Sequence, residues 1–187
     1  ELNSYFIRGE QSDLLIDTGF RRPACQEALE AGLRPVMKFC AGVTHIHKVP
    51  VGDKVSYGGT YTAETERVIA VIAAGYADGY ERSYIGCPVI IGGRKYRSVG
   101  RICMDQFMVD VTDISDALEA AGDFPVTQND EVVLLGSQTW PGEDRGIDGV
   151  EPIEDTITME ELSELSGRFN YEFACDINKR VPRVYFE

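Results

Sequence analysis

Between residues 36 and 110 the chain alternates short apolar runs with glycine-containing turns, and this alternation restricts the fold more than any other feature. The runs are rich in β-branched and aromatic residues, which favour strands over helices. Gly92 and Gly93 separate two such runs, and a Gly-Gly pair in that position is a strong hairpin signal. We therefore predict a mainly β domain, built as a small β-barrel or β-sandwich with short helices.

The flanking regions predict further elements. Residues 3–8 and 13–18 indicate an N-terminal β-hairpin, and a helix is expected to begin at Pro23 and to end before Gly32. We also expect a short helix at 113–121, a strand at 131–136 and a last strand at 180–185. A helix is predicted at 158–166, where Thr158 caps the first turn and Glu161 follows three residues later. The pattern divides the chain into a hairpin–helix segment, 1–32, and a β domain, 33–187.

Composition excludes several classes of function. The 187 residues carry a net charge of −13, which disfavours a nucleic-acid partner because such binding needs a basic face. No apolar run approaches the roughly 20 residues of a membrane helix, so no membrane partner is expected. No signal peptide is visible at the start. The five cysteines are odd in number, widely spaced and without a C-x-x-C pair, which favours a reducing, cytoplasmic location.

A metal site has one candidate. His45 and His47 alternate in T-H-I-H, so on a strand they share a face and could begin such a site. They are the only two histidines, and an imidazole-rich site needs more ligands. We predict no metal, and two surface histidines on an edge strand.

Three glycine-bounded clusters place polar groups inside the β-rich region. They are V-S-Y-G-G-T (55–60), G-Y-A-D-G-Y-E-R (75–82) and G-R-I-C-M-D-Q (100–106). Glycine allows sharp turns and the close approach of a ligand to the backbone. Taken singly, each cluster is also explained by an ordinary turn or a rim tyrosine. The arginines between 82 and 101 suit a bound carboxylate or phosphate, or equally the protection of an exposed strand edge.

In this order, together with L-R-P-V-M before them and N-Y-E and R-V-P-R-V-Y after them, the clusters resemble the C-terminal domain of alanine racemase. The resemblance covers about residues 33–187. In that family the β domain packs against a TIM barrel that carries pyridoxal 5′-phosphate (PLP) on a lysine. The resemblance implies interconversion of L- and D-alanine, which supplies D-alanine for the cell wall. It also implies a head-to-tail homodimer, in which each active site combines one subunit's barrel with the other subunit's β domain.

The resemblance assigns roles to seven positions. Tyr57, in V-S-Y-G, corresponds to the second catalytic base. Three residues correspond to the substrate entrance: Tyr76, Arg82 and Arg101. Met104, through its backbone N–H, and Asp105 approach the substrate carboxylate, and Tyr171 contacts the PLP phosphate.

The chemistry agrees with these assignments. Racemisation removes the α-proton on one face of Cα and returns it on the other, so it needs two bases. A free phenol ionises near pH 10, and a tyrosine base therefore needs a cationic neighbour, which in the family is a barrel residue. Only 32 residues precede the matching region, whereas a TIM barrel takes roughly 250 residues. None of the five lysines lies in a context like that of the PLP lysine, so we expect the chain alone to bind no PLP and to be inactive.

Two other functions remain as alternatives. The same fold could be a non-catalytic binding or regulatory module derived from the racemase domain. Residues 1–32, with N-S-Y-F-I-R-G-E and L-L-I-D-T-G, resemble the start of a metallo-β-lactamase-like hydrolase. That family binds zinc through H-x-H-x-D-H, and the nearest string here, T-H-I-H-K-V-P, lacks the last two ligands.

Overall fold

The structure is a computed structural model that describes residues 5–8, 13–16, 37–112, 126–140 and 153–185. The chain divides into two compact units, one formed by residues 1–36 and 183–187 and the other by residues 37–182. In the first unit, β1 (Tyr5–Arg8) pairs antiparallel with β2 (Asp13–Ile16), which confirms the N-terminal hairpin. The helices predicted at 23–31 and 113–121 lie outside the described residues.

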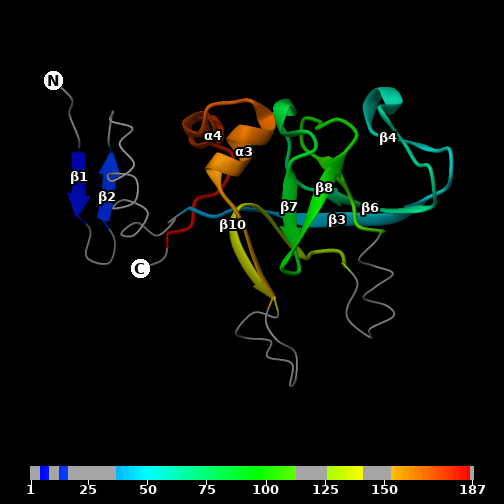
Figure 1. Ribbon diagram of the computed structural model, residues 1–187, viewed down its shortest axis with the longest axis horizontal. Coiled ribbons are helices and arrows are strands. Elements are labelled where there is room, and N and C mark those ends of the chain that lie inside the picture. Colours follow the sequence, from blue (N-terminus) through cyan, green and yellow to red (C-terminus); the bar gives the residue numbers. More distant parts are fainter. Residues whose placement is uncertain (1–4, 9–12, 17–36, 113–125, 141–152, 186–187) are drawn as a thin grey trace, which may run out of the picture. The chain divides into compact units, whose positions relative to one another are not determined.

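The second unit is built on a seven-stranded antiparallel sheet in the order β11-β10-β3-β6-β9-β8-β7 (Figure 1). β10 pairs with β3 on one side and also with β7, so the six strands β10, β3, β6, β9, β8 and β7 close into a ring. β11 pairs antiparallel with the second half of β10, Gly136–Trp140, beyond the part that pairs with β3 and β7. The mainly β fold and its barrel form are therefore confirmed. The strands are β3 (Phe39–Val49), β6 (Arg67–Ile72), β7 (Pro88–Ile91), β8 (Arg94–Val99), β9 (Phe107–Asp110), β10 (Glu131–Trp140) and β11 (Ile153–Ile157).

Local sequence explains how the ring closes. Gly92 and Gly93 both have positive φ and join β7 to β8 as the predicted hairpin. β3 and β10 each contain a shift of register, between Val43 and His45 and between Val133 and Leu135. Such irregularities bend a strand and increase its twist, which lets a short sheet curl onto itself. The strand predicted at 131–136 is confirmed as the first part of β10.

Two helices cover one part of the barrel. In α3 (Met159–Ser166) the Thr158 side chain accepts a hydrogen bond from the Glu161 N–H, so the predicted helix and its cap are confirmed. Gly167 ends α3 in the left-handed conformation. α4 (Asn170–Asp176) was not predicted, and its first residue follows Phe169, which makes no side-chain cap.

Aromatic side chains attach α4 to the barrel. The buried Phe173 ring meets Phe39 of β3 at 5.9 Å and Tyr84 at 5.4 Å between ring centroids. Tyr80 in turn stacks between Tyr84 at 5.2 Å and Phe107 of β9 at 4.9 Å. Aromatic pairs at these separations stabilise a core beyond the area that they bury. This cluster fixes the position of α4 relative to the segment between β6 and β7.

The last strand predicted at 180–185 is wrong. The N–H groups of Arg180 and Val181 both turn back to Asn178, one to its side-chain oxygen and one to its carbonyl oxygen. Pro182 has no N–H to give to a ladder. Residues 177–185 therefore form turns and irregular structure. Within the described parts of the chain, no helix is long and apolar enough to span a bilayer.

Candidate functional site

Tyr57 lies on a sharp turn between two very short strands, β4 (Lys54–Val55) and β5 (Tyr61–Thr62). The turn is the 3-10 helix η1 (Tyr57–Gly59), in which Gly58 and Gly59 have φ of 73° and 56°. A Cβ on Gly59 would come within 2.5 Å of the Lys54 side chain, so both φ and space require glycine. Tyr57 is 74% exposed.

Ser56 fastens this turn to the segment that contains Arg101. Its hydroxyl donates to the Arg101 carbonyl at 2.8 Å and accepts from the Arg101 N–H at 3.0 Å. The Arg101 guanidinium reaches back over the turn, with Nη1 3.4 Å from where a Cβ on Gly58 would stand. Two predicted site residues, Tyr57 and Arg101, are therefore neighbours, although 44 positions separate them in the sequence.

The second and third glycine-bounded clusters meet backbone to backbone. The Tyr76 N–H donates to the Cys103 carbonyl at 3.1 Å and the Ala77 N–H to the Met104 carbonyl at 3.0 Å. A Cβ on Gly75 would lie 2.3 Å from the Cys103 carbonyl oxygen, so this approach requires glycine. The side chains of Tyr76 and Met104 are exposed. No described residue accepts a hydrogen bond from the Met104 N–H, which leaves that donor available to a ligand.

Arg180 holds these two clusters together with the segment after α4. Its Nε lies 2.7 Å from Asp78 Oδ1, and its Nη2 donates to Asp105 Oδ1 at 2.6 Å. The hydrogen bond from Arg180 to Asp105 raises the pKa of the guanidinium. Sequence reasoning missed both Arg180 and Ser56, because their partners lie far away in the chain and no local pattern marks them.

The remaining two predicted residues lie on short helices. Arg82 begins the 3-10 helix η2 (Arg82–Tyr84) and is exposed. Tyr171 is exposed in the first turn of α4, where Arg168 ties the helix down through Glu172 at 3.1 Å and Asp176 at 2.5 Å. The Arg168 guanidinium also lies 5.9 Å from the centroid of the Tyr84 ring. Burial raises the pKa of Tyr84 to about 12, so this tyrosine stays neutral beneath the arginine.

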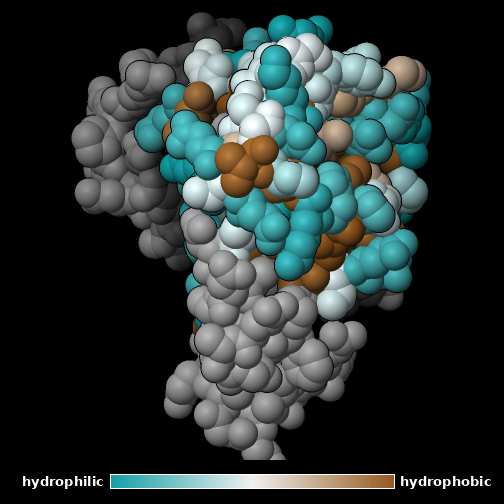
Figure 2. Space-filling view, turned by 90° about the vertical axis from the view of Figure 1, so that its right-hand side faces the viewer, coloured by the Kyte–Doolittle hydropathy of each residue, from teal (hydrophilic) through white to brown (hydrophobic). Residues whose placement is uncertain are grey.

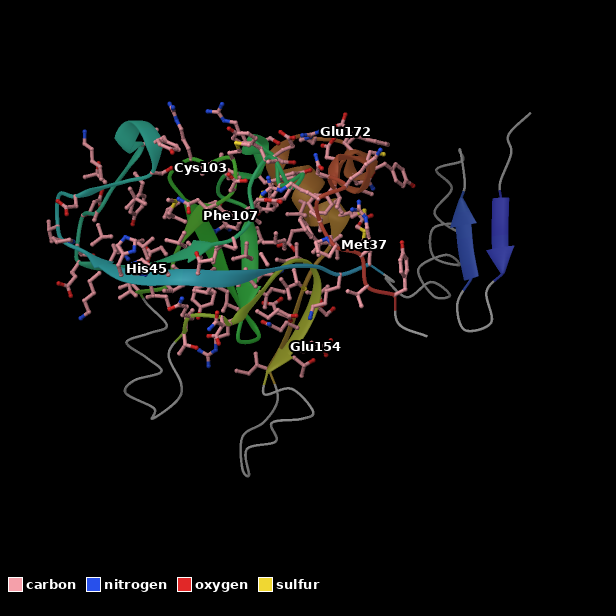
Figure 3. The ribbon with its side chains drawn as sticks, turned by 180° about the vertical axis from the view of Figure 1, so that it is seen from behind. Met37, His45, Cys103, Phe107, Glu154 and Glu172 are labelled. Carbon is pink, nitrogen blue, oxygen red and sulfur yellow. The ribbon has the colours of Figure 1, made fainter. Side chains whose placement is uncertain are left out.

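The predicted residues lie along one edge of the barrel but do not converge on a single point. Figures 1 and 3 place η1 and α4 at separate places on that edge. Between them lie η2 and the loops that contain residues 75–82 and 100–106. In Figure 3, Cys103 and Glu172 both lie at this edge, whereas Phe107 lies inside the barrel. The structure brings Tyr57 beside Arg101 and brings Tyr76 beside Met104 and Asp105, but it does not bring Tyr57 to Tyr171.

The end of the unit that carries η1 faces the viewer in Figure 2. Its surface is mainly hydrophilic, with hydrophobic side chains in small separate patches.

His45 and His47 lie on β3 with their rings stacked at 5.4 Å between centroids. Burial and the neighbouring His45 lower the pKa of His47. In the ranges that the structure covers, no group of three or more potential metal ligands forms.

Tyr171 is the predicted residue with the chemistry to contact a PLP phosphate. The exposed Tyr171 can donate its phenol hydrogen to a phosphate oxygen. Three of the lysines are held in ion pairs with carboxylates: Lys38 with Glu131, Lys48 with Glu66, and Lys95 with Glu161. Lys95 also lies 3.5 Å from Asp155, so this basic residue of the 82–101 stretch forms ion pairs with both α3 and β11.

Comparison with known proteins identifies relatives over most of the chain. The family model "Alanine racemase, C-terminal domain" matches residues 36–185. The alanine racemase of Clostridium novyi is 42% identical over 156 residues, which are 83% of this chain and 35% of that protein. The alanine racemase of Clostridium tetani is 41% identical over 155 residues, 82% of this chain and 34% of that protein. The chain thus spans about a third of the length of the curated relatives that it matches.

Solved structures agree. The alanine racemase of Bacillus anthracis with bound L-Ala-P has a TM-score of 0.69 and 32% identity, covering 90% of this chain and 37% of that one. The biosynthetic alanine racemase of Pseudomonas aeruginosa has a TM-score of 0.67 and 31% identity, covering 86% and 37%.

Proposed function

The chain belongs to the alanine racemase family, as a C-terminal domain, and from this membership we propose that it supplies a tyrosine base and a substrate entrance to a PLP-carrying barrel. The reaction is the interconversion of L- and D-alanine, which provides D-alanine for cell-wall synthesis. The barrel belongs either to the same longer polypeptide or to another one, and two such assemblies form a homodimer.

The observation that carries the proposal is the presentation of Tyr57. Its side chain is 74% exposed, yet its backbone is fixed by two glycines and by the hydrogen bonds of Ser56 to Arg101. A proton-transfer group must be held rigidly while it extends beyond its own domain to a substrate bound on another. A phenol on an anchored turn meets both requirements.

Five of the other predicted residues have a defined part in this function. The Met104 N–H, which no described residue uses, donates to a substrate carboxylate oxygen. The Arg101 guanidinium beside the Tyr57 turn and Arg82 on η2 attract the carboxylate of the substrate towards the entrance. Tyr76 narrows the entrance with an exposed ring. Tyr171 contacts the phosphate of PLP, and PLP when bound supplies the electron sink that stabilises charge at Cα.

The test joins residues 36–187 to the barrel of the Clostridium novyi relative, in place of that protein's own C-terminal domain. We expect the hybrid to racemise alanine and the Tyr57→Phe hybrid to be at least about 100-fold slower, which is the usual contribution of a general base. Tyr61→Phe is the matched control, because Tyr61 is the next tyrosine and its hydroxyl binds Asp110 of β9. D-Alanine formation, followed with a D-amino-acid oxidase, measures all three.

Equal rates for the Tyr57→Phe and unchanged hybrids would contradict the assigned role. The 187-residue chain alone, incubated with PLP and L-alanine, is expected to form no D-alanine. Turnover by the chain alone would show that it does not depend on a separate barrel.

A further inference from the structure

Arg180 occupies a position between two carboxylates that belong to the two loops of the proposed entrance. It reaches Asp78 at 2.7 Å and Asp105 at 2.6 Å, from a segment that follows α4. The two carboxylates are 27 residues apart in the sequence, and Arg180 is 75 residues from Asp105. Its guanidinium therefore contacts two other segments of the chain at this edge, besides the backbone hydrogen bonds that join them.

The contact to Asp78 fixes the guanidinium. Asp78 is largely buried, with 14% of its side chain exposed, and its second oxygen accepts from the Gly75 N–H at 2.9 Å. The Asp78 carbonyl accepts from the Asn178 N–H at 3.0 Å, and the Asn178 side chain accepts from the Arg180 N–H. Arg180 is thus held at its backbone and at its side chain, and it presents the remaining edge of its guanidinium to Asp105.

The charge of Asp105 presents a problem for the proposed function. Asp105 is exposed and directly follows Met104, whose N–H is the donor proposed for the substrate carboxylate. A bare aspartate beside that donor would repel the carboxylate of the substrate. Two like charges a few ångströms apart oppose each other by amounts that alter affinity several-fold. The Arg180 contact at 2.6 Å neutralises this aspartate and also holds it turned towards the C-terminal segment.

We propose that Arg180 is a positioning residue for substrate binding. It neutralises Asp105 so that the Met104 N–H can donate a hydrogen bond to the substrate carboxylate. This inference rests on the proposed racemase function. It concerns affinity for the substrate and not proton transfer by Tyr57. It accordingly separates two kinetic constants: removal of Arg180 changes KM, whereas removal of the Tyr57 hydroxyl changes kcat.

The test measures alanine racemisation by the hybrid enzyme carrying Arg180→Met. We expect KM for alanine to rise on the order of five- to tenfold, with kcat changed less than about twofold. Adding Asp105→Asn to Arg180→Met removes the uncompensated charge and is expected to restore KM. Arg180→Lys keeps the charge and is expected to show an intermediate KM. Lys179→Met is the matched control, because it changes the net charge equally one residue away, and its KM is expected to be unchanged.

A second measurement uses the 187-residue chain itself, without a barrel. Acetate, as a carboxylate probe, is titrated at constant ionic strength while the Met104 amide is followed by NMR. The amide of the unchanged chain is expected to shift, that of Arg180→Met to shift several-fold less at the same concentration, and that of the double variant to recover. The NMR shift can be measured even if the hybrid enzyme carrying Arg180→Met does not fold, because it uses the 187-residue chain.

Three results would overturn the proposal: an unchanged KM in Arg180→Met, a fall in kcat with no rise in KM, or a double variant that stays as impaired as Arg180→Met. The last result would assign Arg180 a purely structural part. Failure of the racemase function itself is distinguished by Tyr57→Phe, because full activity in that variant contradicts the function whatever Arg180 does.

Discussion

Ser56 adopts a backbone conformation that residues other than glycine rarely take, with φ 68° and ψ 174°. A conformation of this kind costs on the order of 1–3 kcal/mol and persists only where surrounding contacts impose it. Here the contacts are the two hydrogen bonds to Arg101 and the close packing of Gly100, on which a Cβ would lie 2.5 Å from that of Ser56. The strain is located next to the proposed base, where rigid placement is useful.

Substitution of Ser56 separates the strain from the hydrogen bonds. Ser56→Ala keeps the strain and loses both bonds, and we expect it to lower the free energy of unfolding by about 1–2 kcal/mol. Ser56→Gly loses the same bonds but relieves the strain, so its loss is expected to be about 1 kcal/mol smaller. Urea unfolding of the two variants measures the difference. Equal stabilities would mean that the backbone at this position is not strained.

At the scale of the elements, an ion pair joins Lys38, the residue directly before β3, to Glu131 at the start of β10. Lys38 Nζ lies 2.6 Å from Glu131 Oε1. Burial by itself would raise the pKa of Glu131, but the hydrogen bond and positive charge of Lys38 outweigh it and lower that pKa below its ordinary value of 4.5. The same surroundings raise the pKa of the neighbouring Cys40 thiol to about 11, chiefly through burial, so this thiol stays protonated.

A pH dependence follows from the lowered pKa of Glu131. A carboxyl group of this kind stabilises the fold fully above its unfolded pKa, near 4.5, and loses that contribution as the pH falls through the lower, folded pKa. We expect Lys38→Met to be less stable than the unchanged chain at pH 6, and this difference to shrink below pH 4.5. The difference should not exceed about 1 kcal/mol, since the two side chains are 44% and 48% exposed. Urea unfolding between pH 3 and 6 tests this, and a difference that grows on acidification would contradict it.

The elements that could be predicted from the sequence are those with local signals. The Gly92-Gly93 hairpin and the Thr158 cap of α3 depend on residues within four positions of each other. α4 could not be predicted, because it has no capping side chain and is held mainly by Phe173 and Arg168, whose partners belong to other elements. The prediction of a last strand at 180–185 was wrong. The N–H groups of Arg180 and Val181 bind Asn178, which precedes the segment that was used for the prediction.

The same limit applies to the site. Glycine-bounded motifs marked Tyr57, Tyr76 and Met104, because a sharp turn or a close backbone approach leaves glycines in the sequence. Nothing local marks a hydroxyl that binds a backbone 45 positions away or a guanidinium that binds an aspartate 75 positions away. The catalytic and binding roles of the marked residues remain predictions that the kinetic tests above address.

The whole molecule consists of two compact units, and the core residues that the structure describes all belong to residues 37–182. They include the aromatic cluster around Tyr80 and the strands of the closed ring. Pairing of β10 with both β3 and β7 closes the six strands into a ring within residues 37–182.

Removal of residues 1–36 is therefore expected to leave the larger unit folded. We predict a single cooperative thermal transition for residues 37–187, with a midpoint within about 2 °C of that of the full chain. Circular dichroism of the two proteins at equal concentration measures this. A truncated chain that is unfolded, or a midpoint lower by tens of degrees, would mean that the first unit contributes to the stability of the second.

The close approach at Gly75 has a consequence for inherited variation. Every change of this residue to another amino acid adds a β-carbon, and a β-carbon there would stand 2.3 Å and 2.4 Å from two carbonyl oxygens. No substitution of Gly75 is therefore tolerated so long as the two loops keep their present backbone contact. The exposed tyrosine beside it is free of that restriction. Evolution can therefore change the selectivity of the entrance through substitutions at exposed positions such as Tyr76. Gly75 has to stay glycine throughout.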